Sequence, residues 1–447
     1  MSLGSLPSHP LAPIILMVHA LPWHRAGGLE RATWMMLEGL LQRGHRVVVL
    51  TTPLPRARAV ELGVLPGEGG WTPSAGLQLV PGRLSVEFVG GRAGHPGPGF
   101  WWHGARRARA LAHELRHEGH GPVIVGVDLA PLWLRGEPFV LQVHGTLFSE
   151  TTLHRGFAGH RAEFPLLQAL WRFKGRLGAA PFFRPMLHAA SAIICDSQFI
   201  HGELQGLSPT GLPPCQVVPL ALPSAWGEAL RGAAAGRLAG GGGEAQAAGA
   251  FTAARPLRVL AVGRQSRIKG FEVAMAALGE VVALRGPVVR MQVAGEASAS
   301  ADDRPQFCHA PWLEFMGRVD DARLAQAYAD ADVFVNVEYN QPAFGLVALE
   351  ALTAGCPVVV SRRGALPEVL GDACGGAPGS CAAGWVVEAG DARALARVLM
   401  EILDAGPAAL EARRLAAAAR ASVFDPATYF VQLFEVLDGV VNDGENA

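Results

Sequence analysis

Short runs of continuous apolar residues alternate with segments of helical periodicity along most of this 447-residue chain. The run Ile14–Val18 is followed by a helical pattern at Leu29–Gln42 and by a second apolar run at Val47–Leu50. Strands that are apolar on both faces and separated by helices are typical of a parallel sheet covered on both sides. The alternation therefore predicts an α/β fold.

The alternation is interrupted at residues 226–255, where four consecutive glycines and many alanines predict a linker or a mobile excursion. We therefore expect an N-terminal domain over 1–225, a C-terminal domain over 256–425, and a helix in 426–447 that packs back on the N-terminal domain. Further strands are predicted at Val123–Val127, Phe139–Val143, Ala192–Cys195, Val217–Leu222, Leu257–Val262, Arg290–Ala294, Leu313–Met316, Val333–Val337, Val358–Val360 and Trp385–Val387, and helices at about 270–285, 321–330, 345–354, 391–404 and 428–440.

Composition excludes several classes of protein. Half of the residues are hydrophobic, only 17% are charged, and the net charge is −1, so neither disorder nor a nucleic-acid partner is expected. No apolar run approaches the roughly 18 residues that a membrane span needs. The start of the chain has no basic segment before its apolar stretch, which argues against a signal peptide. These features indicate a cytoplasmic protein.

The six cysteines do not have the spacing of a zinc site. Cys374 and Cys381 flank a Gly/Pro/Ser loop and are close enough in sequence to pair in an oxidising environment. In a cytoplasmic protein we expect free thiols instead.

Residues 151–188 mix aromatic side chains with six basic residues and a single acid, Glu163. This pattern fits either an acceptor-binding or peripheral membrane-contacting excursion, at the inner membrane face, or a solvated amphipathic helical pair. The sequence does not choose between them.

The stretch Glu338–Val358 predicts a loop, a glycine turn, a helix with one acid, and a buried strand. A helix that begins after a glycine turn directs free N–H groups and its positive dipole end toward the loop, which suits a phosphate. Glu350, on the early turns of that helix, is then within reach of a ribose. The alternative is an ordinary helix–strand unit with a solvated glutamate.

Two other turns suit phosphate. Gly27 and Gly28 separate the first strand from the first helix, where backbone amides can approach an anion, although a tight turn explains them equally. Arg264 and Lys269 follow the strand Leu257–Val262, at the end of a parallel strand where ligands bind. Two cations at this spacing can clamp a diphosphate, the alternative being a surface basic pair. Only two residues of the chain are lysines, which favours a specific use of Lys269.

In order along the chain, several segments resemble retaining glycosyltransferases of family 4, also called glycosyl transferases group 1. The segments are GGLERATWMMLEGLLQRGHRVVVLT, HGTLFSE, VGRQSRIKG, EFMGRVDDARLAQAYADADVFVNV, FGLVALEALTAGCPVVV, GALPEVL and GWVVEAGD. The resemblance implies the GT-B fold, in which two Rossmann-like, doubly wound domains face a central cleft. It also implies a nucleoside-diphosphate sugar as donor, with no cofactor and no metal.

The resemblance also implies roles for individual residues. Arg264 and Lys269 bind the donor diphosphate, and Glu350 binds the ribose hydroxyls. His144 lines the reacting centre, although a histidine at a strand end is often a structural residue. The remaining donor contacts are Gly27 and Gly28 over the diphosphate, Arg318 and Val319 at the base, and Ala343, Phe344, Gly345 and Leu346 at the sugar and phosphate.

One position departs from the family pattern. The family has a glutamate eight positions before Glu350 that contacts the transferred sugar, and this chain has Pro342 there. Proline offers neither a carboxylate nor an N–H. Glu338, Asn340 and Gln341 are the alternative candidates for sugar contacts.

The implied reaction is a front-face transfer, because the sequence contains no evident nucleophile or paired carboxylates for a double displacement. The acceptor is not specified: a small metabolite, a polysaccharide and a lipid-linked sugar all fit. Two other functions compete, namely a sugar-nucleotide 2-epimerase of the same architecture and a catalytically impaired nucleotide-sugar-binding protein, for which Pro342 is the argument.

Overall fold

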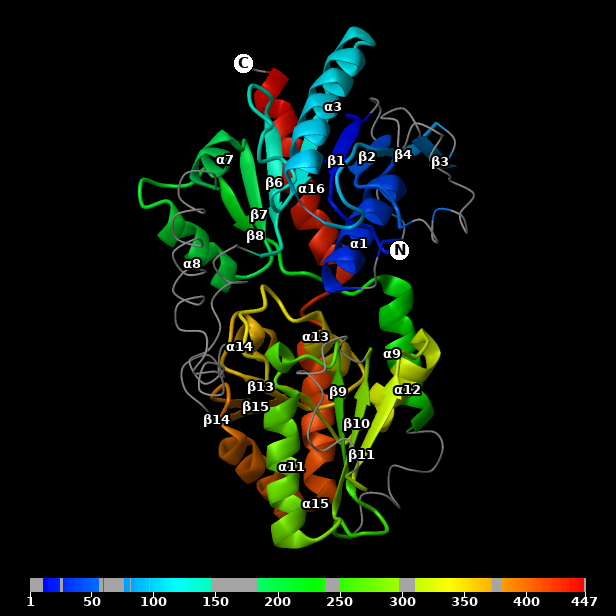
Figure 1. The fold of residues 1–447 in the computed structure, drawn as a ribbon, viewed down its shortest axis with the longest axis vertical. Coiled ribbons are helices and arrows are strands. Elements are labelled where there is room, and N and C mark those ends of the chain that lie inside the picture. Colours follow the sequence, from blue (N-terminus) through cyan, green and yellow to red (C-terminus); the bar gives the residue numbers. More distant parts are fainter. Residues whose placement is uncertain are drawn as a thin grey trace. The chain divides into compact units, whose positions relative to one another are not determined.

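The computed structural model describes residues 11–24, 27–55, 59, 76–80, 82–95, 97–145, 183–237, 249–296, 310–371 and 379–445. The chain forms two compact units. The first contains residues 1–147, 173–220 and 426–447, and the second contains 148–172 and 221–425. Figure 1 shows that helix α16 (Pro426–Glu445), in red, belongs to the first unit although it follows the second unit in sequence.

The first unit is built on an eight-stranded sheet of order β3-β4-β2-β1-β5-β6-β7-β8. All of its strand pairs are parallel except β3–β4. Its strands are β1 (Ile14–Met17), β2 (Val47–Thr51), β3 (Gly76–Val80), β4 (Leu84–Phe88), β5 (Val123–Val127), β6 (Phe139–Val143), β7 (Ala192–Cys195) and β8 (Cys215–Val217), and its other helices are α1 (Gly28–Arg43), α3 (Pro98–His117), α7 (Arg184–Ala189) and α8 (Gln198–Leu207).

The second unit has a seven-stranded sheet of order β11-β10-β9-β12-β13-β15-β14, in which only β14 is antiparallel. Its strands are β9 (Leu257–Val262), β10 (Val289–Ala294), β11 (Leu313–Gly317), β12 (Val333–Asn336), β13 (Val358–Ser361), β14 (Gly379–Cys381) and β15 (Gly384–Val387). Its helices are α9 (Ser224–Arg237), the 3₁₀ turn η3 (Arg267–Lys269), α11 (Phe271–Arg285), α12 (Asp321–Asp330), α13 (Leu346–Thr353), α14 (Leu366–Leu370) and α15 (Ala392–Ala421).

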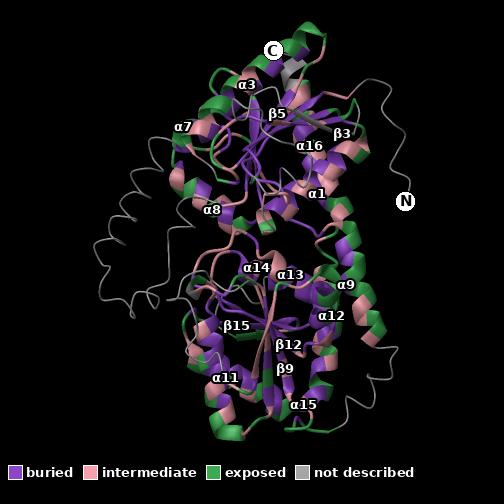
Figure 2. Ribbon diagram, turned by 45° about the vertical axis from the view of Figure 1, so that its right-hand side comes forward, coloured by how far each residue is buried: buried purple, intermediate pink, exposed green. Residues whose placement is uncertain are grey.

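The alternation of apolar strand segments with helices along the chain explains both sheets. The central strands β1, β5 and β6 are buried at every position, as expected for parallel strands with helices on both faces. Figure 2 shows the strands of each unit mostly in the colour of buried residues. In the second unit, α11 and α15 lie side by side (Figure 1) and share one apolar core with β9, β10 and β12. The predicted α/β class and the two doubly wound sheets are confirmed.

Several details differ from the prediction. The strand expected at Val217–Leu222 ends at Val217, because Pro219 has no N–H to continue the ladder. Residues 224–237 form helix α9 rather than a loose linker, since Trp226 and Leu230 are buried and alanine favours a helix. Helix α15 extends to Ala421 across a kink at Gly406.

The thiols are of two kinds. Cys195, Cys215 and Cys356 are free, as expected. Cys381 is disulfide-bonded, so the expectation of free thiols is wrong at this position. This residue ends the edge strand β14 and is partly exposed, unlike the buried Cys195 and Cys356. Cys374 lies outside the described residues.

Within the described part of the chain, no helix is both long and apolar enough to cross a membrane. Of the basic segment 151–188, only residues 183–188 are described, as the start of α7. Its two predicted roles therefore lie outside the described residues.

Candidate functional site

The order of strands in the second sheet creates a natural binding position. From β9 the chain continues to β10 and β11 on one side, and then crosses to β12 on the other side. In open α/β sheets, ligands bind beyond the carboxyl ends of the strands where the order reverses in this way. The loops that follow β9 and β12 therefore define the candidate site.

The loop after β9 is fixed by close backbone approaches. A Cβ on Gly295 would lie 2.0 Å from the carbonyl oxygen of Gly263, so the loops after β9 and β10 touch. Gly270, the N-cap residue before α11, has φ +71°, and a Cβ there would lie 2.0 Å from the carbonyl oxygen of Val337. The first loop is thus held against the end of β12, with Arg264 exposed to solvent.

Lys269 and Glu338 meet where these two loops adjoin. Nζ of Lys269 donates a hydrogen bond to Oε1 of Glu338 at 2.7 Å. The Glu338 side chain is only 3% exposed, whereas that of Lys269 is 30% exposed. Oε2 of Glu338 is buried and has no hydrogen-bond partner among the described residues. A buried carboxylate oxygen of this kind is costly unless a donor satisfies it.

The backbone of residues 338–342 is held by the neighbouring loop. The Ser361 hydroxyl donates to the Glu338 carbonyl at 2.8 Å, Nε of Arg363 donates to the Tyr339 carbonyl at 3.0 Å, and the Ala365 N–H donates to the Pro342 carbonyl at 2.9 Å. Two further buried side-chain oxygens of this segment lack partners among the described residues, those of Asn340 and Gln341. A rigid loop therefore presents three unsatisfied acceptor oxygens.

Helix α13 begins at Leu346, after Gly345 in the left-handed conformation (φ +108°). No side chain caps its first turn, and a Cβ at Gly345 would lie 2.6 Å from Leu366. Phe344 is buried, with its ring centroid 5.3 Å from that of Phe424. The N-terminus of α13 is thus fixed in position and suited to an anion.

Glu350 is buried rather than solvated, so the solvated alternative is wrong. Its Oε1 accepts a hydrogen bond from Nε1 of Trp226 at 3.1 Å, and its Oε2 accepts one from the Tyr328 hydroxyl at 2.8 Å. Neither partner is among the residues predicted from the sequence. Tyrosine occurs only three times in the chain, and Trp226 is an aromatic residue in an Ala/Gly-rich stretch. Their unusual placement was the only feature of the sequence that could have marked them as partners of Glu350.

Arg318 and Val319 follow β11, two strands away from β9 in the sheet. The Arg318 side chain is largely exposed and lies 3.3 Å from Glu296. The contact of Arg318 and Val319 with the base stays a prediction.

In the first unit, His144 belongs to a buried network at the carboxyl ends of three neighbouring strands. Its Nδ1 lies 2.7 Å from Oδ2 of Asp196, after β7, and its N–H donates to Oδ1 of Asp128, after β5, at 2.7 Å. Gln142 donates to the other oxygen of Asp196 at 3.0 Å. Nε2 of His144 is buried without a partner among the described residues.

Two opposing effects act on the pKa of His144. Burial is the larger single effect and lowers it, but the charge and hydrogen bond of Asp196, with smaller contributions from Asp128 and Glu30, together outweigh burial. The pKa of His144 is therefore raised. The carboxylate fixes the ring with Nδ1 toward Asp196, so Nε2 is the nitrogen available to a ligand.

The Gly27–Gly28 turn already adjoins a negative charge. Helix α1 begins at Gly28, and the buried carboxylate of Glu30 lies so close that a Cβ on Gly27 would be 2.3 Å from its Oε2. Glycine at position 27 therefore makes room for Glu30. A carboxylate in the first turn is favourable for the helix dipole, but it opposes the approach of a second anion.

Comparison with protein families agrees with these features. Residues 256–405 match the model described as glycosyl transferases group 1, and residues 26–222 match that of glycosyltransferase family 4. This chain belongs to glycosyltransferase family 4. Pro342 stands where the resemblance predicts a glutamate, and Glu338 lies on the same loop.

Curated relatives match over part of their length. The chain is 35% identical over 136 residues to phosphatidyl-myo-inositol mannosyltransferase of Mycolicibacterium smegmatis, covering 30% of this chain and 33% of that protein. It is 38% identical over 124 residues to D-inositol 3-phosphate glycosyltransferase of Segniliparus rotundus, covering 26% and 27%. The matched segments span about a third or less of these family 4 relatives.

Solved structures share the fold. Sucrose-phosphate synthase from Thermosynechococcus elongatus superimposes with a TM-score of 0.69 at 19% identity, covering 97% of this chain and all of that chain. The Anabaena protein HepE, solved in complex with UDP-glucose, gives a TM-score of 0.59 at 19% identity, covering 96% and 100%. The family 4 chain thus has the GT-B fold.

No group of three His, Cys, Asp or Glu side chains in the described part of the chain is arranged to hold a metal ion.

Proposed function

We propose that this protein is a retaining glycosyltransferase that moves a sugar from a nucleoside-diphosphate donor to an acceptor hydroxyl. One observation carries the proposal: Lys269 and Glu338 meet at the carboxyl ends of β9 and β12, where the strand order of the second sheet reverses. Arg264 lies on the same loop as Lys269, and the uncapped N-terminus of α13 follows the same loop as Glu338. This set of groups suits a diphosphate with a sugar attached.

The proposed roles divide the donor among three groups. Arg264 and Lys269 bind the diphosphate, and the amides at Phe344–Leu346 add hydrogen bonds from the helix terminus. Glu350 binds the ribose hydroxyls. A carboxylate offers about four lone-pair positions, so it can accept hydrogen bonds from Trp226, Tyr328 and a ligand together.

We assign the sugar contact to Glu338, in place of the glutamate that Pro342 replaces. Its unsatisfied Oε2 is an acceptor for a sugar hydroxyl or ammonium, and Asn340 and Gln341 add further buried acceptors. Because Glu338 lies four positions earlier on the loop, the preferred donor differs at this contact from an ordinary glucosyl or mannosyl donor. An amino- or deoxy-sugar donor is the expected class.

The reaction follows from these roles as a front-face transfer. The acceptor hydroxyl attacks the anomeric carbon as the bond to the diphosphate breaks, and the leaving phosphate oxygen takes the proton of the acceptor. The protein contributes positioning and charge stabilisation. We propose that His144 contributes Nε2 to the reacting centre from the first unit.

The first test is a thermal-shift and transfer panel with UDP-, GDP-, ADP- and dTDP-sugars. UDP-sugars come first because a structure of similar fold contains UDP-glucose. Inositol phosphates belong in the acceptor panel because two relatives are named for inositol-containing acceptors. Better use of an unmodified glucosyl or mannosyl donor than of amino or deoxy donors on the same nucleotide would reject the proposed sugar class.

Lys269→Ala tests the transfer itself. We expect a loss of about two to three orders of magnitude in kcat/KM, the scale for losing a preorganised charge at the leaving group. Arg285→Ala is the control, because Arg285 pairs with Asp404 at the other end of α11. Near-normal turnover by Lys269→Ala would reject this role.

A nucleotide-sugar-binding protein without turnover is the second candidate, and Pro342 is the observation that favours it. Calorimetry distinguishes the two functions. Binding of a donor with no transfer to any acceptor, and no change of the donor incubated alone, would support the binding protein.

A further inference from the structure

Trp226 lies near the start of α9 in the second unit and contacts Glu350, the proposed ribose ligand. The second unit resumes at Ala221, and α9 begins three residues later. Nε1 of Trp226 donates to Oε1 of Glu350 across 124 positions of sequence. Trp226 is 8% exposed, so the indole is packed and its N–H has a fixed direction.

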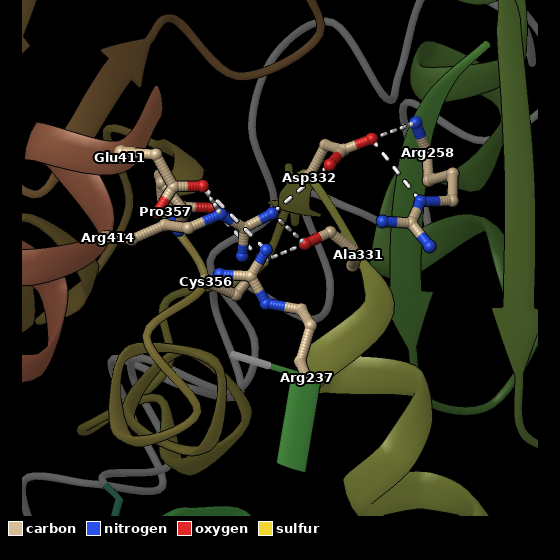
Figure 3. Close-up of polar contacts among 8 residues, drawn as sticks. All are labelled: Arg237, Arg258, Ala331, Asp332, Cys356, Pro357, Glu411 and Arg414. Carbon is tan, nitrogen blue, oxygen red and sulfur yellow. Dashed lines mark hydrogen bonds and ion pairs between the residues drawn. The ribbon is translucent and has the colours of Figure 1, made fainter. Parts of the chain in front are cut away.

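Helix α9 is held in the second unit along its length. It packs against α12 and α13, and Leu230 is fully buried. At its last residue, Arg237 lies 3.7 Å from Glu411 of α15. Figure 3 shows Arg237 beside Arg414, whose Nη2 donates to the Ala331 carbonyl at 2.7 Å. The position of Trp226 is therefore set by the body of the unit and not by a free linker.

Tyr328 completes the arrangement from a third helix. Its hydroxyl donates to the other oxygen of Glu350 at 2.8 Å, and its ring is fully buried near Phe334, with centroids 5.5 Å apart. One donor on each oxygen fixes the rotation of a carboxylate about its last bond. Both donors are neutral, so neither of them cancels the charge of the Glu350 carboxylate.

We propose that Trp226 and Tyr328 are positioning residues for the ribose of the donor, acting through Glu350. They hold the carboxylate in the orientation in which its remaining lone pairs meet the 2′- and 3′-hydroxyls. This inference rests on the ribose role given to Glu350 in the proposed function. Its consequence is that α9, and not only α13, determines nucleotide affinity.

A purely structural role makes a different prediction. If the indole only fills space, its replacement weakens the fold and lowers the affinity for every nucleotide alike. If it acts through Glu350, the effect depends on the ribose hydroxyls. Ribose dependence is therefore the measurement that separates the two roles.

The experiment measures Kd by calorimetry for the nucleoside diphosphate of the accepted donor, UDP being tried first, and for its 2′-deoxy and 3′-deoxy forms. The variants are Trp226→Phe, Tyr328→Phe and Glu350→Gln. Trp312→Phe is the matched control, because Trp312 is 9% exposed and packs in the core of the same unit. Tyr328→Phe removes a single oxygen and provides the test if Trp226→Phe does not fold.

We expect Trp226→Phe and Tyr328→Phe each to weaken binding of the ribonucleotide roughly tenfold, the scale for losing a hydrogen bond to a charged group. On a deoxy form whose missing hydroxyl contacts Glu350, the loss should fall to about twofold or less. Equal losses on ribo and deoxy forms, or losses matching those of Trp312→Phe, would overturn the inference. If Glu350→Gln weakens binding of the ribo and deoxy forms equally, the ribose role of Glu350 itself is overturned. Failure of the positioning role can thus be told apart from failure of the ribose role.

Discussion

The ammonium of Lys269 lies 2.7 Å from Oε1 of Glu338, although 69 positions of sequence separate the two residues. This pair places a lysine and a buried carboxylate at the point where β9 and β12 end. The Lys269–Glu338 pair has no net charge. In the unliganded protein, the positive potential that attracts a diphosphate therefore comes from Arg264 and from the N-terminus of α13. Each residue of the pair has two roles, because it holds the two loops together and is also a proposed ligand of the donor.

The pair predicts that stability and activity respond differently to its removal. Lys269→Met leaves the buried carboxylate of Glu338 without its cation, and we expect a loss of about 1–3 kcal/mol in the free energy of unfolding, reduced from the fully buried case because Lys269 is partly exposed. The double variant Lys269→Met/Glu338→Gln should recover most of this loss. Urea denaturation of the single and double variants gives the comparison.

Transfer should not recover in the same double variant, since both proposed ligands of the donor are absent. An active double variant would show that neither residue takes part in the reaction. A double variant as unstable as Lys269→Met would show that the ion pair is not what stabilises the loops.

Gly270 and Gly286 are the cap residues on either side of α11, and both have positive φ. Alanine at either position should cost about 1–3 kcal/mol through backbone strain. Only Gly270→Ala also meets the Val337 carbonyl, at 2.0 Å, whereas nothing lies within 4 Å of a Cβ on Gly286. We therefore expect Gly270→Ala to displace Lys269 and weaken donor binding about tenfold or more, with Gly286→Ala binding normally. Thermal unfolding and donor calorimetry on both variants measure these effects, and equal donor affinity would contradict the prediction.

Local patterns in the sequence were sufficient to predict much of this fold. Continuous apolar runs predicted β9 and β12, and the helical periodicity that follows them predicted α11 and α13, because these signals depend on neighbouring residues. The placement of Arg264 and Lys269 at a strand end follows directly. Glu338 was among the candidates because it lies on the loop with Pro342.

Contacts between distant segments were not predictable in the same way. The pairing of Lys269 with Glu338 requires β9 and β12 to be neighbours, which depends on the crossing of the chain between the two halves of the sheet. The contact of Trp226 with Glu350 could not be predicted from composition, because the alanines and glycines around Trp226 indicated a linker. There, tertiary packing of two apolar side chains decided the structure.

The contact between His144 and Asp196 predicts a pH-dependent contribution to stability. The pKa of His144 is raised above the ordinary value of 6.5, so the folded state binds the proton more tightly than the unfolded state. The stabilisation is complete below about pH 6.5 and is lost as the pH rises through the raised pKa. In Asp196→Asn the counter-charge is gone and burial lowers the pKa, so this dependence should disappear.

Unfolding free energies of wild type and Asp196→Asn between about pH 5.5 and pH 9 provide the measurement. The difference between the two proteins should be largest at the acid end. A difference that stays constant across this range would show that His144 is neutral in the folded protein throughout it.

The thiols of Cys195 and Cys215 lie on the neighbouring strands β7 and β8. The neighbouring Cys195 thiol lowers the pKa of Cys215 against the opposing effect of burial, and the proximity of Cys215, together with burial, raises the pKa of Cys195. Burial raises the pKa of Cys356 to about 12.

Because the thiolate is the reactive form, Cys215 should alkylate first among these three and at a lower pH than an ordinary thiol. Iodoacetamide labelling of the native protein with peptide mapping by mass spectrometry measures the order. Cys195→Ala should slow labelling of Cys215 at neutral pH, and unchanged labelling would show that the thiol pair does not control its reactivity.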